Sequence, residues 1–426
     1  MQTISYGQLL RRNRDFRLLW GGQVVSQLGD WFSLITLQSL LLTLTGSASS
    51  LAALMIAQML PLFLLSPAAG VVVDRLPRKH VMIAADLGRA GIALGFLLVR
   101  DGETAWLAYG FYALLSSLTV FFEPARQAVI PAITRPEELV TANALGAVTW
   151  SVLLTCGALA GGLVTQYFGH DAAFVLNSLS FVGSAFFIRA IRLPRPPSLD
   201  EPARGIPGAF ADLASGFRYV VGRRELLALL SVKAAWGMTY GSTVLLTLFG
   251  QRIFPLAPGK GPLTISLLTA ASGVGTALGP IIGRRLAGSD LRRMLAVIPI
   301  SYLGSGLFFL ALSRTGGLAG AAEAFCGARM GGSTLWVFST VLLQRTAADR
   351  FRGRVFAAEG ALFTLTMAAS GFAVGAAVDH GASAFTVATA LGAISLTAGV
   401  AWCVGLQFIG REKAGGSSPI STQGVE

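Results

Sequence analysis

Charged side chains are scarce in this sequence: aspartate, glutamate, lysine and arginine together make up 13% of its 426 residues. A soluble globular domain carries about 25%. Hydrophobic residues make up 53%, and apolar runs of about 18 residues or more, long enough to cross a bilayer, recur along the chain. These runs exclude a soluble protein with an unusually apolar core and indicate a polytopic protein embedded in the lipid bilayer.

Cysteine is also rare, and its placement excludes two kinds of site. The three cysteines lie inside apolar segments, at Cys156, Cys326 and Cys403. They show neither a disulfide framework nor zinc-ligand spacing. The Walker A pattern is absent as well, which argues against ATP-driven transport by this chain alone. We therefore expect no cofactor and no metal.

Histidine is equally sparse. The three histidines fall at loops or helix ends, at His80, His170 and His380. A histidine relay at mid-membrane, an H-E-x-x-H metal set and a Cys-His pair at depth are all missing, so an intramembrane enzyme is not expected. A sensor or scaffold usually needs an attached soluble domain, and no loop here is long enough to form one.

The net charge of +12 does not indicate nucleic-acid binding, because the basic residues lie in short clusters between apolar segments. Of the 33 lysines and arginines, 26 fall in the N-terminus, the C-terminus and every second loop. The opposite loops hold only Arg100, Arg252, Lys260 and Arg314. The positive-inside rule then predicts a multi-pass inner-membrane protein with both termini in the cytoplasm.

Apolar segments, turn signals and charges together predict twelve transmembrane helices. The first six lie near 17–43, 49–73, 80–99, 104–125, 139–168 and 171–191, and the second six near 225–250, 262–286, 291–312, 317–344, 353–379 and 383–408. The predicted organisation is an N-terminal six-helix bundle (1–192), a cytoplasmic linker with a short amphipathic helix (193–224), a C-terminal bundle (225–410) and a disordered tail (411–426).

A charged motif follows the second predicted helix: Gly70-Val-Val-Val-Asp74-Arg75-Leu-Pro-Arg78-Lys79. It resembles the G-x-x-x-D-R-x-x-R-K signature of the major facilitator superfamily, in the loop where that family carries it. The alternative is a basic loop of no special kind. The resemblance implies an all-α membrane protein with two pseudo-symmetric six-helix bundles, in which the charges of this loop bridge the two halves.

Other stretches resemble one exporter group within that superfamily, which includes macrolide efflux pumps and the enterobactin exporter. They span residues 23–34, 121–145 and 350–360. The first two also resemble the bacterial lysophospholipid transporter. The resemblance implies a secondary active exporter of an amphipathic small molecule, such as a drug or siderophore, which exchanges it for protons by alternating access. The alternative is a lysophospholipid flippase of the same fold. A monomer is expected.

The fifth predicted helix contains Gly157-Ala-Leu-Ala-Gly161-Gly162. It resembles the antiporter motif G-P-x-x-G-G, with Ala158 in place of the proline. Small residues at this spacing also simply permit close helix packing. The departure from the motif leaves antiport only weakly supported by these residues.

Asp30 is the main candidate for proton coupling. It lies 14 residues after Phe16, about 21 Å along a helix and hence near mid-bilayer. Gln23, Ser26, Gln27 and Ser33 share its helical spacing, so we expect a polar stripe that faces a central cavity. The alternative is a structural carboxylate paired with a buried base or with a helix dipole.

The remaining cavity candidates are Lys233, Trp236, Tyr240, Tyr112 and Arg329. One hypothesis pairs Lys233 with Asp30 across the cavity when no substrate is bound; the alternative is that Lys233 snorkels to the cytoplasmic surface. We expect Tyr112 to line the outer cavity, or else to pack. Arg329 is expected to meet an anionic group, or Glu323 through water.

A second group of charged residues is predicted to form a cytoplasmic gate. Its members are Asp74, Arg75, Arg78, Glu123, Arg126, Arg354 and Glu359. We expect Glu359 to cluster there with Asp74, Arg126 and Arg354. Asp86 and Arg89 lie three residues apart on one helix and are expected to pair with each other.

Overall fold

The computed structural model describes residues 4–193, 218–288 and 290–415, and within these ranges the chain is helical, with no strand. The N-terminal half consists of α1 (Tyr6–Arg12), α2 (Arg14–Thr45), α3 (Ser49–Arg75), α4 (Arg78–Gly95), α5 (Ala105–Ile133), α6 (Pro136–Val152) and α7 (Ala158–Arg189). A π-helical turn joins α6 to α7. Gly169 has a φ of 84° and kinks α7, a conformation that glycine adopts readily. This kink separates the predicted helices 139–168 and 171–191.

The C-terminal half repeats this arrangement. It consists of α9 (Arg224–Gly237), α10 (Ser242–Leu248), α11 (Gly261–Ala287), α12 (Leu291–Leu312), α13 (Leu318–Thr346), α14 (Asp349–Asp379) and α15 (Ala384–Gly415). The predicted continuous helix 225–250 is interrupted between α9 and α10. Ser370 of α14 accounts for the break, because its hydroxyl donates to the carbonyl of Met238 and accepts from the amide of Gly241.

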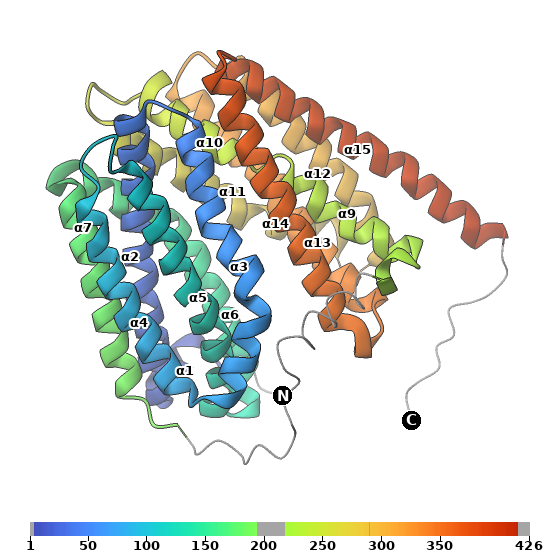
Figure 1. Ribbon diagram of the computed structural model, residues 1–426. Helices are drawn as coiled ribbons and strands as arrows, with labels where there is room; N and C mark the ends of the chain where they lie inside the picture. The colour runs from blue at the N-terminus through green and yellow to red at the C-terminus, as the bar shows by residue number, and fades with distance from the viewer. Residues whose placement is uncertain (1–3, 194–217, 289, 416–426) are drawn as a thin grey trace.

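Within the described ranges, nine helical runs are long and apolar enough to cross a membrane. One of them, Pro136–Arg189, contains two crossings with the Gly169 kink between them. The interrupted α9–α10 segment and α13, which carries Glu323 and Arg329, complete the twelve predicted crossings. The fold is therefore an all-α membrane protein of two six-helix bundles, standing side by side in Figure 1.

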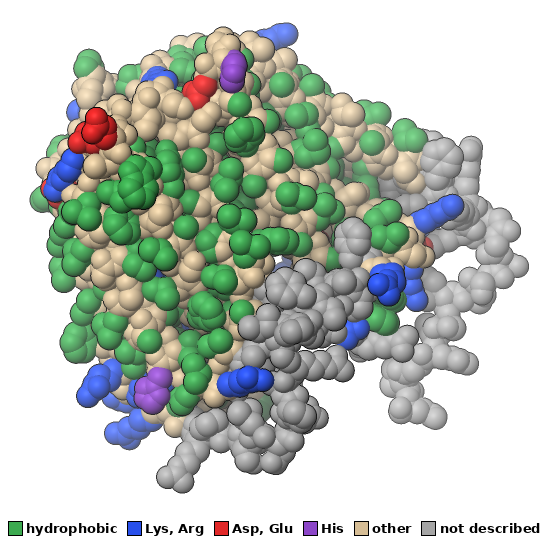
Figure 2. Space-filling model, in the orientation of Figure 1, with side chains coloured by type: hydrophobic (Ala, Val, Ile, Leu, Met, Phe, Trp, Pro, Cys, Tyr) green, Lys and Arg blue, Asp and Glu red, His purple; other side chains and the backbone are tan. Residues whose placement is uncertain are grey.

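The surface matches this arrangement. On the face shown in Figure 2, hydrophobic side chains cover the sides of the molecule, while charged groups gather toward its two ends. We call the end that carries α1, the α3–α4 turn and the α5–α6 turn the basic end. The end that carries the α2–α3 turn and the α14–α15 turn is called the opposite end (Figure 1).

Two predicted segments fall largely outside the described residues. The linker 193–224 is described only at 193 and from 218 onward, where residues 218–221 form one helical turn before α9. Of the predicted tail 411–426, the first part is helical, because α15 continues to Gly415, and residues 416–426 lie outside the described ranges. The short helix α1 was not predicted, although Ser5 and Gln8 cap it reciprocally.

The glycines of the segment 157–162 bring helices into close contact. A side chain on Gly161 would meet the backbone of Trp31 in α2. A side chain on Gly162 would meet Ser266 and the carbonyl of Pro262 in α11, which belongs to the other half. The packing interpretation of this segment therefore holds, and its small residues join the two halves near the opposite end.

Polar contacts also join the halves at the opposite end. The carboxylate of Asp379, at the end of α14, accepts hydrogen bonds from the amides of Ala48 (2.7 Å) and Ser49 (2.9 Å) and from the hydroxyl of Ser47. These groups lie at the N-terminus of α3, where Ala48 makes no side-chain cap of its own. An acid of the C-terminal half thus caps a helix of the N-terminal half, with a charge that favours that helix end.

Arg252, a base of the C-terminal half, makes a similar contact with the end of α2, the helix before α3. Arg252 donates to the carbonyls of Gly46 (2.6 Å) and Leu42 (3.4 Å), at the C-terminus of α2. Gln251 donates to the Thr43 hydroxyl at 2.7 Å. Helix ends leave amides and carbonyls without partners. Asp379 and Arg252 supply partners to such groups from across the interface, and Gln251 adds a side-chain contact beside them. We call Gln251, Arg252 and Asp379 the clasp.

We predict that Asp379→Ala loosens the opposite end. Loss of an N-terminal capping residue costs about 1 kcal/mol, so the equilibrium between closed and open arrangements at this end should shift about fivefold toward the open one. Spin labels at the exposed positions Glu103 and Arg314 report the distance between the halves by double electron–electron resonance. The variant should enlarge the long-distance population.

Asp171→Ala is the matched control, since Asp171 lies at the same end but pairs with Arg100 of its own half (2.9 Å). Its distance distribution should equal that of the wild type. An unchanged distribution in Asp379→Ala, or an equal change in both variants, would show that the clasp does not hold the halves together.

Candidate functional site

The larger of two described cavities lies in the N-terminal half near the basic end. It measures about 670 Å³ and lies among α2, α5 and α6. Its polar lining side chains are Gln23, Gln27, Glu123, Arg126, Gln127 and Asn143, and its aromatic ones are Phe16, Trp20 and Trp150. Aromatic and amide groups around a few charges suit an amphipathic small molecule.

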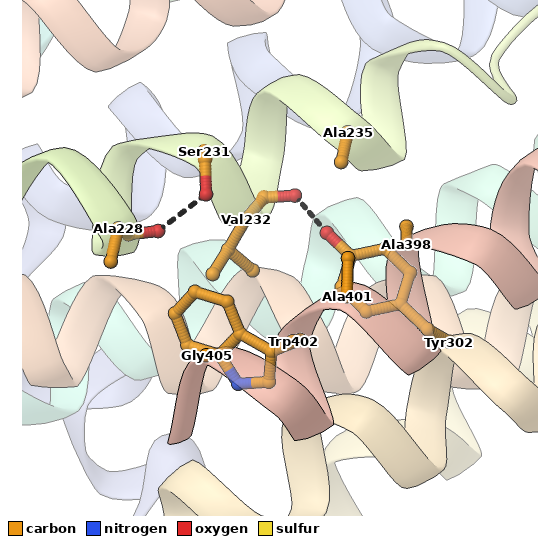
Figure 3. Close-up of a pocket in the computed structure, with 9 residues that line it drawn as sticks. All are labelled: Ala228, Ser231, Val232, Ala235, Tyr302, Ala398, Ala401, Trp402 and Gly405. Carbon is orange, nitrogen blue, oxygen red and sulfur yellow. Dashed lines mark hydrogen bonds between the residues drawn. The ribbon is translucent and has the colours of Figure 1, made fainter. Parts of the chain in front are cut away.

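A second pocket, drawn in Figure 3, differs in character. It measures about 220 Å³ and lies among α9, α12 and α15. Its lining is mainly alanine with Val232 and Trp402, and the Tyr302 hydroxyl donates to the Val232 carbonyl. It has no charged lining residue, unlike the larger cavity.

Glu123 and Arg126 form an ion pair in the wall of the larger cavity. Arg126 donates to the Glu123 carboxylate at 2.7 and 3.2 Å, one turn away on α5, and to the Gln23 amide oxygen at 3.1 Å. These contacts join α5 to α2 within the N-terminal half. Both residues were predicted to form part of a gate; the structure places them in the wall of the cavity.

Asp30 lies near the middle of α2, one turn beyond the cavity-lining Gln27. It is half-buried, and among the described residues it has no hydrogen bond or salt bridge. The charges that act on it are those of Arg89, Asp86 and Glu123. Each of these already has an oppositely charged partner. Asp30 is thus a carboxylate at mid-membrane depth without a base of its own.

Arg89 is the cation that acts on Asp30, and it already has a carboxylate partner. It pairs with Asp86, as predicted from their spacing, and both side chains are buried. Its guanidinium also lies between the rings of Phe122 (4.3 Å) and Phe181 (4.5 Å). This arrangement holds Arg89 within the core of the N-terminal half.

The predicted polar stripe on α2 divides into two faces. Gln23 and Gln27 line the cavity. Ser26 is buried and donates to the backbone of Gln23, and Ser33 is buried and accepts from Asn177 of α7. Ser33 therefore joins α2 to α7 and Ser26 bonds within α2. Gln23 accepts from Arg126, whereas the amide oxygen of Gln27 has no partner and remains available to a ligand.

Lys233 does not pair with Asp30, so that hypothesis is wrong. Its ammonium donates to Glu359 of α14 at 2.8 Å and to the Thr340 hydroxyl of α13 at 2.9 Å. Both charged side chains are buried, at 4% and 3% exposure, so Lys233 does not snorkel to the surface either. Burying the two charges as a pair costs far less than burying either alone.

Glu359 consequently lies outside the predicted gate. Among the described residues its partner is Lys233 within the C-terminal half, not Arg126 or Arg354. One of its carboxylate oxygens is buried without a hydrogen-bond partner. Arg354 lies beside the Phe351 ring, 5.6 Å from its centroid.

Four aromatic side chains surround this region, and we call them the aromatic wall: Trp236, Tyr240, Trp336 and Phe363. Trp236 stacks on Phe363 with centroids 5.4 Å apart. Trp336 and Tyr240 each meet both rings edge-on. Trp336 also covers the Lys233 ammonium at 4.1 Å, yet is itself 43% exposed. The sequence interpretation identified Trp236 and Tyr240 but missed Trp336 and Phe363.

Arg329 adjoins the aromatic wall. It donates to the Thr243 hydroxyl at 3.0 Å, and its guanidinium lies 4.7 Å from the centre of the Tyr240 ring. Among the described residues it has no carboxylate partner. Glu323, six positions earlier on α13, is exposed.

Tyr112 lines neither of the two described cavities. It is 6% exposed and packs in an apolar cluster of the N-terminal half, with its ring 6.4 Å from that of Phe96. The alternative interpretation, that this tyrosine packs, is therefore the correct one.

The charged loop after α3 binds backbone carbonyls within its own half. Arg78 donates to the carbonyl of Ala128 in α5 at 3.0 Å, and Lys79 to that of Ile191 at 2.8 Å. Arg75 is exposed, and the Asp74 side chain lies outside the described residues. The contacts of Arg78 and Lys79 therefore differ from the expected bridge between the halves.

We predict that Lys233→Gln and Glu359→Gln each lower the free energy of unfolding by about 3–5 kcal/mol, because each leaves one buried charge unpaired. The double change Lys233→Met/Glu359→Leu should recover most of this loss, because it removes both charges together. Thermal unfolding in detergent, followed by tryptophan fluorescence, measures the three variants.

The exposed pair Arg100–Asp171 provides the control, since its side chains are more than half exposed. Single changes there should alter stability by about 0–1 kcal/mol. If the buried single variants unfold like these controls, the Lys233–Glu359 pair does not carry the stability assigned to it.

Comparison with known proteins accords with this geometry. The chain is 28% identical over 307 residues to the uncharacterized MFS-type transporter YkuC of Bacillus subtilis (strain 168), covering 70% of this chain and 71% of that protein. It is 25% identical over 342 residues to the putative bacilysin exporter BacE of the same strain, covering 79% and 81%. It is 26% identical over 364 residues to macrolide efflux protein A of Streptococcus pyogenes, covering 83% and 86%.

Solved structures share the fold at low sequence identity. The nucleoside transporter NupG superposes with a TM-score of 0.69 at 12% identity, covering 92% of this chain and 99% of that one. A bacterial homologue of the iron transporter ferroportin, in an inward-facing state, gives 0.63 at 17% identity, with coverage of 92% and 99%. The sequence model of one family matches residues 19–371. This chain belongs to the Major Facilitator Superfamily.

Proposed function

We propose that this protein is a secondary active exporter of an amphipathic small molecule, which it exchanges for protons by alternating access. It works as a monomer in the inner membrane, with both termini and the basic end in the cytoplasm. The observation that carries the proposal is the combination of a polar and aromatic cavity near the basic end with a hydrogen-bonded closure at the opposite end. Two relatives are named as an exporter and an efflux protein, which supports transport out of the cell.

Alternating access follows from where the two halves are joined. The clasp and the glycine contacts of α7 with α11 hold them together at the opposite end. The cavity then communicates with the cytoplasm. For release outside, these contacts must open while the basic end closes. Because Arg252 and Asp379 of the clasp are exposed side chains at helix ends, water replaces their hydrogen bonds when the clasp opens.

Asp30 supplies the proton coupling. A carboxylate without a paired base at mid-membrane is stabilised by binding either a proton or a cationic group of the substrate. The two cannot occupy it together, so proton binding displaces the substrate. This mutual exclusion is the requirement for antiport, and it needs no histidine at that depth.

The substrate enters through the larger cavity. Trp20 and Trp150 offer apolar area, whereas Gln27 offers an amide whose oxygen is buried without a partner. A hydrogen-bond donor on the substrate satisfies that oxygen. These features favour a compound that is apolar over most of its surface and polar at defined points.

We predict that Asp30→Asn abolishes substrate-triggered proton movement. The test is proton flux in proteoliposomes with a pH-sensitive dye, with macrolides, aromatic dipeptides and lysolipids added in turn. In the wild type at least one compound should trigger proton movement, and the variant should reduce its rate at least tenfold.

Asp101→Asn is the control, since Asp101 lies in the exposed loop before α5. It should behave as the wild type does. Movement of compounds or lysolipids without any proton signal, unaffected by Asp30→Asn, would refute proton antiport and favour a flippase or facilitator.

A further inference from the structure

The charges near the middle of the described helices fall into pairs, with two exceptions. Asp86 pairs with Arg89, Glu123 with Arg126, and Lys233 with Glu359, each within one half. Asp30 in the N-terminal half and Arg329 in the C-terminal half have no oppositely charged partner among the described residues. Each half therefore presents one uncompensated charge, and the two charges have opposite signs.

The two buried pairs are poor ligands for a substrate. The Lys233–Glu359 pair is buried under Trp336, and Arg89, paired with Asp86, lies between two phenylalanine rings. A substrate would have to break a buried ion pair to engage either of them, whereas Glu123 and Arg126 lie in the cavity wall and neutralise each other there. Asp30 and Arg329 are both only half-buried and need no such rearrangement.

Arg329 is built to accept an anion. Its guanidinium has five N–H donors in a planar fork. One donates to Thr243, and the Tyr240 ring supports one face of the plane. Most of its donors are free for a carboxylate or a similar anionic group, which the planar fork matches in bidentate geometry.

The two charges lie at comparable depth. Asp30 is 15 residues before the end of α2 at Thr45, and Arg329 is 11 residues after the start of α13 at Leu318. At about 1.5 Å per residue these positions are roughly 22 and 17 Å from the opposite end. The aromatic wall lies beside Arg329, through its contact with Tyr240.

We propose that the substrate is a dipolar, zwitterionic amphipathic molecule that carries a cationic group for Asp30, an anionic group for Arg329 and an aromatic or apolar body for the aromatic wall. This inference rests on the proposed function and specifies the substrate class of the same transport site. A compound with a single charge leaves either Asp30 or Arg329 unpaired, and is disfavoured for that reason.

The substrate class is tested with three matched probes on one scaffold: phenylalanyl-phenylalanine, its C-terminal amide and its N-acetyl derivative. They are dipolar, cationic and anionic respectively, and they share the same two rings. Binding to the purified protein in lipid nanodiscs, without any gradient, is measured by equilibrium dialysis. The dipolar probe should bind at least tenfold more tightly than either singly charged probe.

Two variants show which residue binds the cationic group of the probe and which binds its anionic group. The Asp30→Asn variant should bind the dipolar probe no more tightly than the N-acetyl probe. The Arg329→Gln variant should bind the dipolar probe no more tightly than the amide. The Arg329→Lys variant should recover part of the tighter binding of the dipolar probe. Arg314 is an exposed arginine outside the site, so the control variant Arg314→Gln should bind all three probes as the wild type does. Size-exclusion elution confirms that each variant is folded.

Equal affinity for the three probes, no saturable binding of the dipolar probe, or an equal loss for all probes in both variants would overturn the proposal. These outcomes are distinct from a failure of the proposed function. If the dipolar probe binds as expected but moves no protons in proteoliposomes, the substrate class stands and antiport fails. If only singly charged compounds trigger proton movement, antiport stands and the dipolar substrate is excluded.

Discussion

The structure depends on the free energy of placing a charge away from water. At the centre of a bilayer, insertion scales give about 2.5–3.5 kcal/mol for each charged side chain. This chain meets that cost by pairing: Asp86–Arg89, Glu123–Arg126 and Lys233–Glu359 each join groups of one half. Because no pair among these crosses between the halves, the two bundles can move relative to one another without separating a buried ion pair.

The contacts between the halves are of a different kind. At the opposite end, Asp379 and Arg252 bind backbone groups at helix ends, where water is an alternative partner. Close glycine packing between α7 and α11 adds van der Waals contact without ionic attraction. Strong electrostatic interactions inside each half and replaceable ones between the halves are the properties that a rocking transporter requires. The two unpaired charges, Asp30 and Arg329, are the groups that we propose bind the ligands.

The number and placement of the helices could be predicted from sequence, because apolar length and loop charge are properties of continuous segments. Asp86–Arg89 could also be predicted, since their spacing puts them on one helix face. Lys233 and Glu359 are 126 positions apart, and no local pattern indicates which of several carboxylates the lysine meets. The break between α9 and α10 likewise depends on Ser370, which lies on a helix distant in sequence. Trp336 and Phe363 join the aromatic wall only because three helices pack together, which no local pattern predicts.

The central claim is that a proton and a substrate compete for Asp30. The direct test is the number of protons released when ligand binds, measured with a pH-indicator dye in weakly buffered nanodiscs. Saturating the wild type with the dipolar probe at a pH where Asp30 is protonated should release a proton for each molecule bound. Asp30→Asn should release none under the same conditions. Ligand binding without proton release in the wild type, or equal release in the variant, would contradict the account.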